Sequence, residues 1–295
     1  MILSGKEVAN KIREEVKNEC LNFVKESSHT PCLAVVLVGD DPASSTYVAS
    51  KGKVCDEVGF KHKDIFLDKD ISEIDLINKI EELNTDDSVD GILVQLPLPK
   101  HLSERKVIGS IVSDKDVDGL HLNNLGSLIT EENNFVPCTP KGILKILDYY
   151  NIQTTGKNVV VVGRSNIVGK PIAALLMQKG KDATVTVCHS KTKDLEKVTK
   201  TADILIAAIG RANFITKEMV KPEAVVIDVG INRVQDSSRK SGYRIVGDVD
   251  YENVVSYVDA ITPVPGGVGP MTIASLMENT LIAARKHYDK RRTAR

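Results

Sequence analysis

Short runs of branched apolar residues recur along this 295-residue chain and constrain its fold more than any other feature. In the first half, CLAVVLVG (32–39) and VDGILVQLPLP (89–99) are continuous apolar runs of the kind found in buried parallel strands. Between them the patterns indicate a helix over 42–59, a short strand near 62–67 and a helix near 72–83. The order β-α-β-α-β predicts a parallel α/β layer.

The second half of the chain repeats this alternation. A helix is expected over 140–150, followed by a strand at 159–162, a glycine-containing turn and a helix from near Lys170. Three further apolar runs predict strands at 183–192, 202–210 and 224–232. The pattern is typical of a doubly wound nucleotide-binding sheet. A last helix from Pro270 has one apolar face, and periodicity alone assigns it to neither half.

The composition is that of a soluble globular protein large enough for two domains. Hydrophobic residues make up 42% and the net charge is −1, so we expect no nucleic-acid partner and no membrane binding. The five cysteines are scattered without a C-x-x-C, which argues against a disulfide framework or a zinc site and fits a reducing compartment. Because the chain shows no signal core, no presequence and no run of 18 apolar residues, a cytoplasmic protein without a metal is expected.

The segment GRSNIVG (163–169) joins an apolar strand to a helix, as a phosphate-binding turn would. Gly163 and Gly169 suit the ends of such a turn, although Ser165 occupies its middle and the spacing departs from G-x-G-x-x-G. Arg164 and Ser165 are placed to meet phosphate oxygens. A buried strand, turn and helix without a ligand is the alternative interpretation.

The next strand ends in CHSKT (188–192), which bears on the choice of cofactor. An NAD site usually has an acidic residue near this point for the ribose 2′-hydroxyl, whereas an NADP site has polar or basic groups for the 2′-phosphate. No acid occurs before Asp194, so NADP is favoured. His189 is a candidate base, but a histidine at this strand end is better explained as shaping the phosphate site.

Candidate catalytic residues lie at helix and strand ends of the first half. Tyr47 and Lys51 are four residues apart and would share one face of a helix, although such pairs also arise by chance. Gln95 ends an apolar strand, where it either caps backbone or faces a substrate. Asp118 lies in KDVDGL (115–120), which on spacing alone is a turn. PVPGGVGP (263–270) is either a plain loop or backbone laid against a ligand.

Eight motifs follow one another over nearly the whole chain: YVASK (47–51), DGILVQLPLP (90–99), KDVDGL (115–120), PCTPKGI (137–143), VVGRSNIVGKP (161–171), TVCHSKT (186–192), VIDVGIN (226–232) and TPVPGGVGPMT (262–272). Together they closely resemble the bifunctional methylenetetrahydrofolate dehydrogenase/methenyltetrahydrofolate cyclohydrolase family. The resemblance implies two α/β domains flanking a cleft, the second a Rossmann-like doubly wound parallel sheet, in a homodimer. It implies a folate-binding catalytic domain of residues 1–146 with 270–295, and an NADP-binding domain of residues 147–269.

The resemblance also implies two reactions. NADP+ takes a hydride from 5,10-methylenetetrahydrofolate, and water then opens the 5,10-methenyl cation to 10-formyltetrahydrofolate. By the family's pattern Tyr47 stacks on the folate, Lys51 is the acid/base residue of the hydrolysis and Gln95 orients it. Asp118 binds the amino and ring N–H groups of the pterin.

Further contacts come from the same pattern. Those to folate are implied for Val94, Leu96, Pro265, Gly266 and Gly267, and those to NADP for Gly163, Arg164, Ser165, Ser190 and Ile231.

Three alternatives compete with this reading. In a short-chain dehydrogenase the Tyr-x-x-x-Lys pair follows the glycine turn, whereas here Lys51 precedes Gly163 in a separate α/β unit, so that alternative fails on order. A monofunctional dehydrogenase would lack the lysine. A non-enzymatic NADP-binding sensor would leave Lys51, Gln95 and Asp118 without a shared purpose.

Overall fold

The computed structural model describes residues 1–132, 134–239 and 242–293. The chain divides into two compact units. Unit 1 comprises residues 1–9 and 139–272, and unit 2 comprises residues 10–138 and 273–295. Of the helices in the described residues, none is long and apolar enough to cross a membrane.

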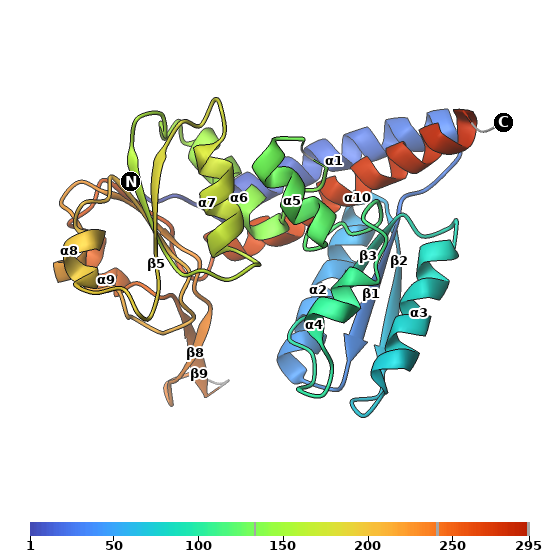
Figure 1. The fold of residues 1–295 in the computed structure, drawn as a ribbon, viewed down its shortest axis with the longest axis horizontal. Helices are drawn as coiled ribbons and strands as arrows, with labels where there is room; N and C mark the ends of the chain where they lie inside the picture. Colours follow the sequence, from blue (N-terminus) through green and yellow to red (C-terminus); the bar gives the residue numbers. More distant parts are fainter. Residues whose placement is uncertain (133, 240–241, 294–295) are drawn as a thin grey trace. The chain divides into compact units, whose positions relative to one another are not determined.

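The described part of unit 2 contains one sheet of three parallel strands, with β1 in its centre (Figure 1). The strands are β1 (Cys32–Val38), β2 (Lys61–Leu67) and β3 (Gly91–Val94). Helix α3 (Glu73–Thr85) buries its apolar residues in the same hydrophobic core as alternate residues of β1. These residues are Ala34, Val36, Val38, Leu76, Ile80 and Leu83. The predicted parallel α/β layer is therefore confirmed for this half.

Helix α2 (Pro42–Val58) has sequence signals at both of its ends and carries Tyr47 and Lys51. The Asp41 side chain accepts a hydrogen bond from the Ser44 N–H at 2.8 Å, as an N-cap does. At the other end Gly59 has φ +84°, the left-handed conformation that stops a helix at little steric cost. These caps fix where the helix begins and therefore which residues share a face.

Four more helices complete the described part of unit 2: α4 (Glu104–Gly109), α5 (Leu122–Thr130), and the greater parts of α1 (Gly5–Ser27) and α10 (Val268–Thr293). Helices α1 and α10 run side by side (Figure 1), with the rings of Phe23 and Tyr288 5.9 Å apart and an Arg285–Glu19 ion pair of 3.1 Å. From Ile273 onwards, the last helix of the chain thus belongs to unit 2.

Unit 1 contains, in its described residues, a sheet of five parallel strands in the order β10-β7-β6-β4-β5. These strands are β4 (Asn158–Val162), β5 (Thr184–Cys188), β6 (Ile204–Ala207), β7 (Val225–Asp228) and β10 (Ala260–Ile261). The chain leaves β4 first to one side, for β5, and then returns to the other, for β6. In doubly wound sheets the crevice between two such strands is the usual ligand site. The predicted doubly wound sheet is confirmed.

The remaining elements of unit 1 cover or extend this sheet. They are α6 (Cys138–Tyr149), α7 (Gly169–Met177), α8 (Leu195–Thr199), the 3₁₀ turn η1 (Lys217–Met219), α9 (Tyr251–Val254), and an antiparallel hairpin of β8 (Asn232–Gln235) and β9 (Tyr243–Val246). The N-terminus joins the sheet edge, where the Leu3 N–H donates to the Ile261 carbonyl at 2.8 Å. Arg233, which has no clear role in the sequence, lies over the Tyr243 ring at 4.8 Å across the hairpin.

One strand is shorter than the sequence predicts. The apolar run 89–99 continues to Pro99, but β3 ends at Val94. The Gln95 N–H still donates to the Val36 carbonyl at 2.8 Å. Pro97 and Pro99 have no N–H and cannot extend the ladder. The chain turns away from the sheet immediately after Gln95, so the side chain of that residue lies at the carboxyl end of the strand.

Candidate functional site

Lys51 and Gln95 form a direct hydrogen-bonded pair in unit 2. The Lys51 side chain points from α2 and is only 6% exposed. Its Nζ donates to Gln95 Oε1 at 2.5 Å. The amide nitrogen of Gln95 donates in turn to the Leu96 carbonyl at 2.7 Å, which fixes the orientation of the amide. A buried amine is thereby held at the carboxyl end of β3 by an amide oxygen that accepts a hydrogen bond from it.

Tyr47 lies one helical turn before Lys51 on α2. Its ring centroid is 5.8 Å from Lys51 Nζ, and the side chain is 41% exposed. The lysine head group is therefore close to an aromatic face that remains accessible to a flat ligand. The pairing of these residues on one helix face, which the sequence predicts, is the observed geometry.

Electrostatics couple Lys51 to Asp118. Burial lowers the pKa of Lys51, and the negative charge of Asp118 opposes this shift. The pKa of Asp118 is raised to about 6, first by burial and then by the charge of Asp116, against the effects of Lys51 and Cys138. An amine of lowered pKa and a carboxyl group whose pKa is raised to about 6 therefore influence each other, an arrangement typical of proton-transfer sites.

The other predicted folate contacts differ in accessibility. Val94 is buried in the hydrophobic core of unit 2, so its side chain faces other apolar residues. Leu96 is half-buried and packs against the same core. Because the Val94 side chain is buried, only the backbone of this residue can contact a ligand at the end of the strand.

Pro265, Gly266 and Gly267 belong to unit 1, in the loop after β10. Pro265 is exposed, and the Gly266 carbonyl accepts from the Lys6 N–H at 2.9 Å. A Cβ added to Gly267 would lie 2.4 Å from the Pro263 carbonyl oxygen, so only glycine fits there. The loop is tightly folded backbone ending at the start of α10, as the Gly/Pro-rich sequence indicates.

The predicted phosphate turn lies where β4 and β6 meet, at the crevice of the unit 1 sheet. Gly163 follows β4 with φ +134°, and a Cβ there would lie 2.1 Å from the Ala208 carbonyl oxygen. A Cβ on Gly169 would lie 2.2 Å from the Gly163 carbonyl oxygen. Both glycines are thus required by close backbone packing. The turn brings the N-terminus of α7 to the carboxyl edge of the sheet, which suits a diphosphate.

Arg164 and Ser165 present their side chains from this turn. Both are exposed. Ser165 Oγ accepts from the Val168 N–H at 3.1 Å and from the Gly169 N–H at 3.4 Å, so its own proton is left to donate. A cation and a hydroxyl donor beside a helix N-terminus are groups that bind phosphate oxygens.

Ser190 lies in the turn after β5, next to the phosphate turn in the sheet. The Gly163 N–H donates to the Cys188 carbonyl at 2.9 Å, which joins the two turns. His189 Nδ1 accepts from the Lys191 N–H at 3.1 Å, so this histidine shapes the turn in which Ser190 is exposed. No acidic side chain occurs in 188–192, and a 2′-phosphate would meet no like charge from this turn.

Two buried carboxylates that the sequence analysis did not single out hold the loops around Ile231. Asp248 accepts from the N–H groups of residues 209, 210 and 211 at 2.6 to 2.9 Å and from Asn232 Nδ2 at 2.9 Å. Asp228 accepts from the Gly230 N–H at 2.9 Å. Ile231 itself is 49% exposed between them. For Asp228, the sequence signal was its charge inside the apolar run AVVIDVGIN (224–232).

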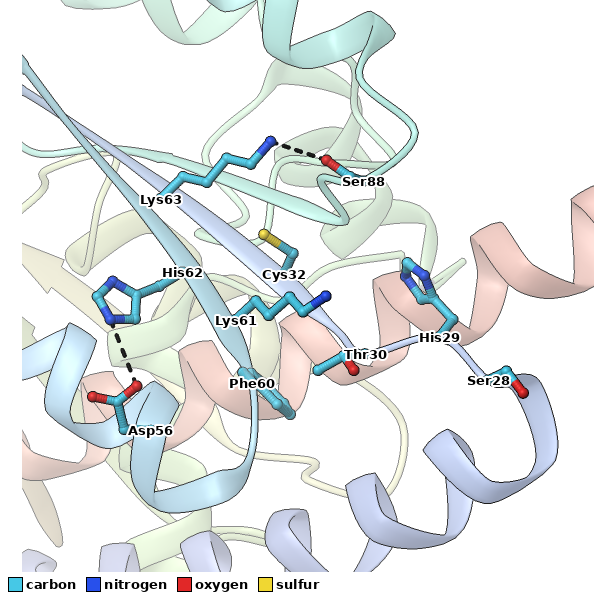
Figure 2. A pocket seen from close by; sticks show the side chains of 10 residues that line it. All are labelled: Ser28, His29, Thr30, Cys32, Asp56, Phe60, Lys61, His62, Lys63 and Ser88. Atoms are coloured by element: carbon cyan, nitrogen blue, oxygen red, sulfur yellow. Dashed lines mark hydrogen bonds and ion pairs between the residues drawn. The ribbon is translucent and has the colours of Figure 1, made fainter.

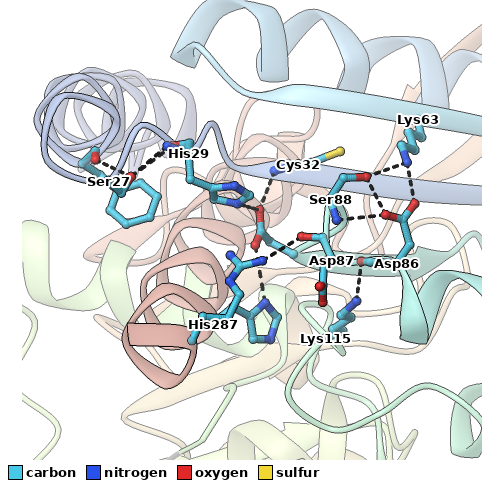
Figure 3. Close-up of polar contacts among 12 residues, drawn as sticks. Ser27, His29, Cys32, Lys63, Asp86, Asp87, Ser88, Lys115 and His287 are labelled. Carbon is cyan, nitrogen blue, oxygen red and sulfur yellow. Dashed lines mark hydrogen bonds and ion pairs between the residues drawn. The ribbon is translucent and has the colours of Figure 1, made fainter. Parts of the chain in front are cut away.

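A cavity of about 630 Å³ lies at the other edge of the unit 2 sheet, and none of the predicted site residues lines it (Figure 2). Two of its lining side chains, those of Lys63 and His29, have partners close by. Lys63 Nζ donates to Asp86 at 2.6 Å and to Ser88 at 2.9 Å, and His29 bonds the buried Asp90 at 2.8 Å (Figure 3). Lys61 also lines the cavity and is exposed, and the partners of Lys63 and His29 offset the charge of those two side chains only.

Comparisons with known proteins agree with this geometry. Residues 3–118 match the family model of the tetrahydrofolate dehydrogenase/cyclohydrolase catalytic domain, and residues 137–288 match that of its NAD(P)-binding domain. The bifunctional protein FolD of Chlorobium phaeobacteroides is 54% identical over 97% of this chain and 98% of the relative.

Two solved structures are similar over almost the whole chain. The bifunctional FolD dehydrogenase/cyclohydrolase from Campylobacter jejuni has a TM-score of 0.91 at 50% identity, covering 97% of this chain and 99% of that one. The Trypanosoma brucei dehydrogenase-cyclohydrolase, complexed with NADP and an inhibitor, has a TM-score of 0.92 at 36% identity, covering 97% of each chain. The resemblance found in the sequence is confirmed: the chain belongs to the tetrahydrofolate dehydrogenase/cyclohydrolase family.

Proposed function

We propose that this protein oxidises 5,10-methylenetetrahydrofolate with NADP+ to the 5,10-methenyl cation and hydrolyses that cation to 10-formyltetrahydrofolate. The observation that carries the proposal is the buried Lys51–Gln95 pair beside Asp118. A dehydrogenase without hydrolysis has no use for a buried amine of lowered pKa at the carboxyl end of β3.

Lys51 acts as the general base of the hydrolysis. Its amine donates one hydrogen to Gln95 Oε1, which leaves the lone pair of the neutral form free to take a proton from water. The water oxygen bonds to the carbon between N5 and N10 while Lys51 takes the proton. The carbon–N5 bond then breaks, N5 receives a proton from the Lys51 ammonium, and the former water oxygen loses its second proton to become the formyl oxygen. The net products are 10-formyltetrahydrofolate and one proton.

The neutral form of Lys51 is favoured by two effects. Burial already lowers its pKa, and the positive charge of the methenyl substrate lowers it further. Asp118 acts in the opposite direction, but its charge is partly neutralised when it accepts hydrogen bonds from the amino and ring N–H groups of the pterin. The rate of hydrolysis should therefore fall as pH falls through the pKa of Lys51.

The folate is held by groups around this pair. Tyr47, on α2, stacks on the ring system, and Asp118 accepts hydrogen bonds from the N–H groups of the pterin. Contacts along the rest of the substrate come from Val94, Leu96, Pro265, Gly266 and Gly267.

The residues of unit 1 fit an NADP site. Gly163 and Gly169 let backbone approach the diphosphate, Arg164 and Ser165 bind its oxygens, and Ser190 lies beside the 2′-phosphate. Ile231 covers the cofactor from the loop after β7. When bound, NADP+ accepts the hydride from the methylene carbon of the substrate.

The cellular setting is part of the proposal. We expect a cytoplasmic homodimer that takes tetrahydrofolate derivatives and binds neither nucleic acid nor membrane. The division of the chain into a folate-binding domain and an NADP-binding domain belongs to the same hypothesis.

The deciding experiment follows the absorbance of purified protein with 5,10-methylenetetrahydrofolate and either NADP+ or NAD+, and then adds acid. Both activities predict reduction of NADP+, with methenyl product appearing only after acid recyclises the formyl compound. Methenyl product that accumulates without acid indicates a dehydrogenase alone. No reduction with either cofactor indicates a protein that binds NADP without turnover.

A further inference from the structure

Asp116 is a buried carboxylate around which the turn carrying Asp118 is folded. Its side chain is 1% exposed. Oδ1 accepts from the Gly119 N–H at 3.2 Å, and Oδ2 accepts from the His121 N–H at 2.7 Å and from Asn124 Nδ2 at 2.7 Å. The chain therefore closes on itself around Asp116, and Asp118 lies within the closed turn.

The turn requires glycine at position 119. Its φ of +77° is a conformation that other residues rarely adopt, and a Cβ there would lie 2.7 Å from the Pro137 nitrogen. Only glycine therefore fits next to Asp118 within the packing of unit 2.

Three elements of unit 2 anchor the same segment from outside. From β3, the Ile92 N–H donates to the Lys115 carbonyl at 2.7 Å. From α10, the buried Asn279 donates to the carbonyls of Val117 at 2.9 Å and Val136 at 3.0 Å. The Lys115 ammonium donates to two carbonyls at the end of α3, at 3.0 and 2.8 Å. The hydrogen bonds from Ile92, Asn279 and Lys115 hold this six-residue segment more firmly than an ordinary surface turn is held.

We propose that Asp116 is a positioning residue for Asp118, holding the turn that presents Asp118 to the pterin and placing a second carboxylate beside it. This inference rests on the proposed function, in which Asp118 binds folate. It goes further by assigning the affinity of that contact, and its dependence on pH, to a residue that lies behind the binding surface.

The titratable groups that act on Asp118 are Asp116 from the same turn, Lys51 from α2 and Cys138 from α6. The charge of Asp116 raises the pKa of Asp118, whereas Lys51 and Cys138 lower it. The ionised carboxylate is the form that accepts hydrogen bonds from the pterin. With a pKa of about 6, Asp118 should lose this form as pH falls through 6, and folate binding should weaken there.

The test is the dissociation constant of tetrahydrofolate, measured by titration calorimetry between pH 5 and 8, for wild type and Asp116→Asn. The variant removes the charge and one of the two acceptor positions. We expect the dissociation constant at pH 7.5 to rise about tenfold, since the turn is less well held. We also expect the weakening at acid pH to begin at a lower pH than in wild type, because the charge that raises the pKa of Asp118 is gone.

Two further variants separate positioning from general loss of structure. Asn124→Ala keeps the charge of Asp116 and removes a side-chain anchor, so affinity should fall while the acid weakening stays at its wild-type pH. Asp90→Asn alters another buried carboxylate of unit 2, which bonds His29 and the Cys32 N–H, and should change neither quantity. Circular dichroism checks that each variant is folded.

The outcomes distinguish this inference from the function on which it rests. If wild type does not bind tetrahydrofolate, or if Asp118→Asn binds it as wild type does, the proposed role of Asp118 is wrong. If those results are as expected but Asp116→Asn leaves the acid weakening in place, only the positioning role is overturned. Should Asp116→Asn not fold, unchanged affinity in Asn124→Ala overturns it, and reduced affinity supports it.

Discussion

Two carboxylates, one in each unit, have the same raised pKa and opposite surroundings. Burial raises the pKa of Asp118 in unit 2 and of Asp228 in unit 1 to about 6. Asp228 accepts from the N–H groups of Gly230, Asp248 and Val249 at 2.8 to 2.9 Å. Within residues 1–132, 134–239 and 242–293, no backbone N–H donates to the carboxylate of Asp118, and its partner is the Cys138 thiol.

The difference teaches that a perturbed pKa does not by itself identify a functional group. The acceptor capacity of Asp228 is used by the protein's own backbone, so this residue builds the loops at the crevice of the sheet. Asp118 keeps acceptor positions for a ligand, and a buried amine of lowered pKa is its neighbour. The free hydrogen-bonding capacity, more than the pKa, indicates which carboxylate binds a substrate.

The largest effect that tests this comparison is expected for Lys51→Met, which keeps the volume of the side chain and removes the base. Hydrolysis of the methenyl compound should fall about 10³-fold, because the water loses its proton acceptor. Binding of NADP, measured by fluorescence, should be unchanged. Full hydrolytic activity in this variant would mean that the buried amine is structural, as Asp228 is.

The two carboxylates can be compared directly by replacing each with alanine. Asp118→Ala should weaken folate binding about hundredfold, since two charge-assisted hydrogen bonds are lost, and should change the free energy of unfolding by less than about 1 kcal/mol. Asp228→Ala leaves three N–H groups unpaired and should destabilise the protein by about 3 kcal/mol. Urea denaturation and calorimetric titration give both quantities. Equal stability losses for the two variants would remove the distinction.

The pH dependence of stability gives a second measure of Asp228. Its pKa is about 6 in the folded protein and near 3.8 when exposed, so the folded state binds the additional proton between these values. The contribution of Asp228 to stability should therefore decrease as pH rises from 4 to 6, by about 3 kcal/mol, and stay constant above. The difference in stability between wild type and Asp228→Ala should show this slope, because Asp118, whose pKa is also raised to about 6, contributes equally to both proteins and cancels. A difference curve without the slope would show that the three N–H donors outweigh burial.

The sequence predicted the scaffold of both regions better than their polar interiors. Apolar runs such as those at 32–38 and 158–162 predict buried strands, because the composition of a short segment can be read without knowing the rest of the fold. β10 has two residues and no periodicity to detect, and the strands β8 and β9 have four residues each, none of them buried, so the apolar pattern predicts neither β10 nor this hairpin. Element type follows from local pattern, whereas short edge elements depend on the rest of the sheet.

The site divides in the same way. The glycines of 163–169 are visible in sequence because the turn they form is local. Asp248 bonds N–H groups almost forty residues before it, and no spacing rule connects them. Spacing alone predicts only a turn at Asp118, and the family resemblance supplies its role. That role depends on the groups that folding brings around the carboxylate, which the local sequence does not show. Local chemistry can be predicted from sequence, but hydrogen-bonding capacity left free by folding cannot.

The smallest expected effect concerns Arg164, which contributes to the cofactor site by an exposed charge and not by burial. Arg164→Ala should raise the Michaelis constant for NADP+ about tenfold, since a charge-assisted contact to phosphate is lost, and should leave that for folate unchanged. Arg244→Ala is the matched control, because it removes another exposed arginine of unit 1, whose partner is Glu252 at 3.9 Å. Steady-state kinetics with each substrate varied in turn provide the measurement. Equal increases in the Michaelis constants for both substrates would place Arg164 outside the phosphate site. An increase of the same size in Arg244→Ala would mean that Arg164 acts only through the overall positive charge of the surface.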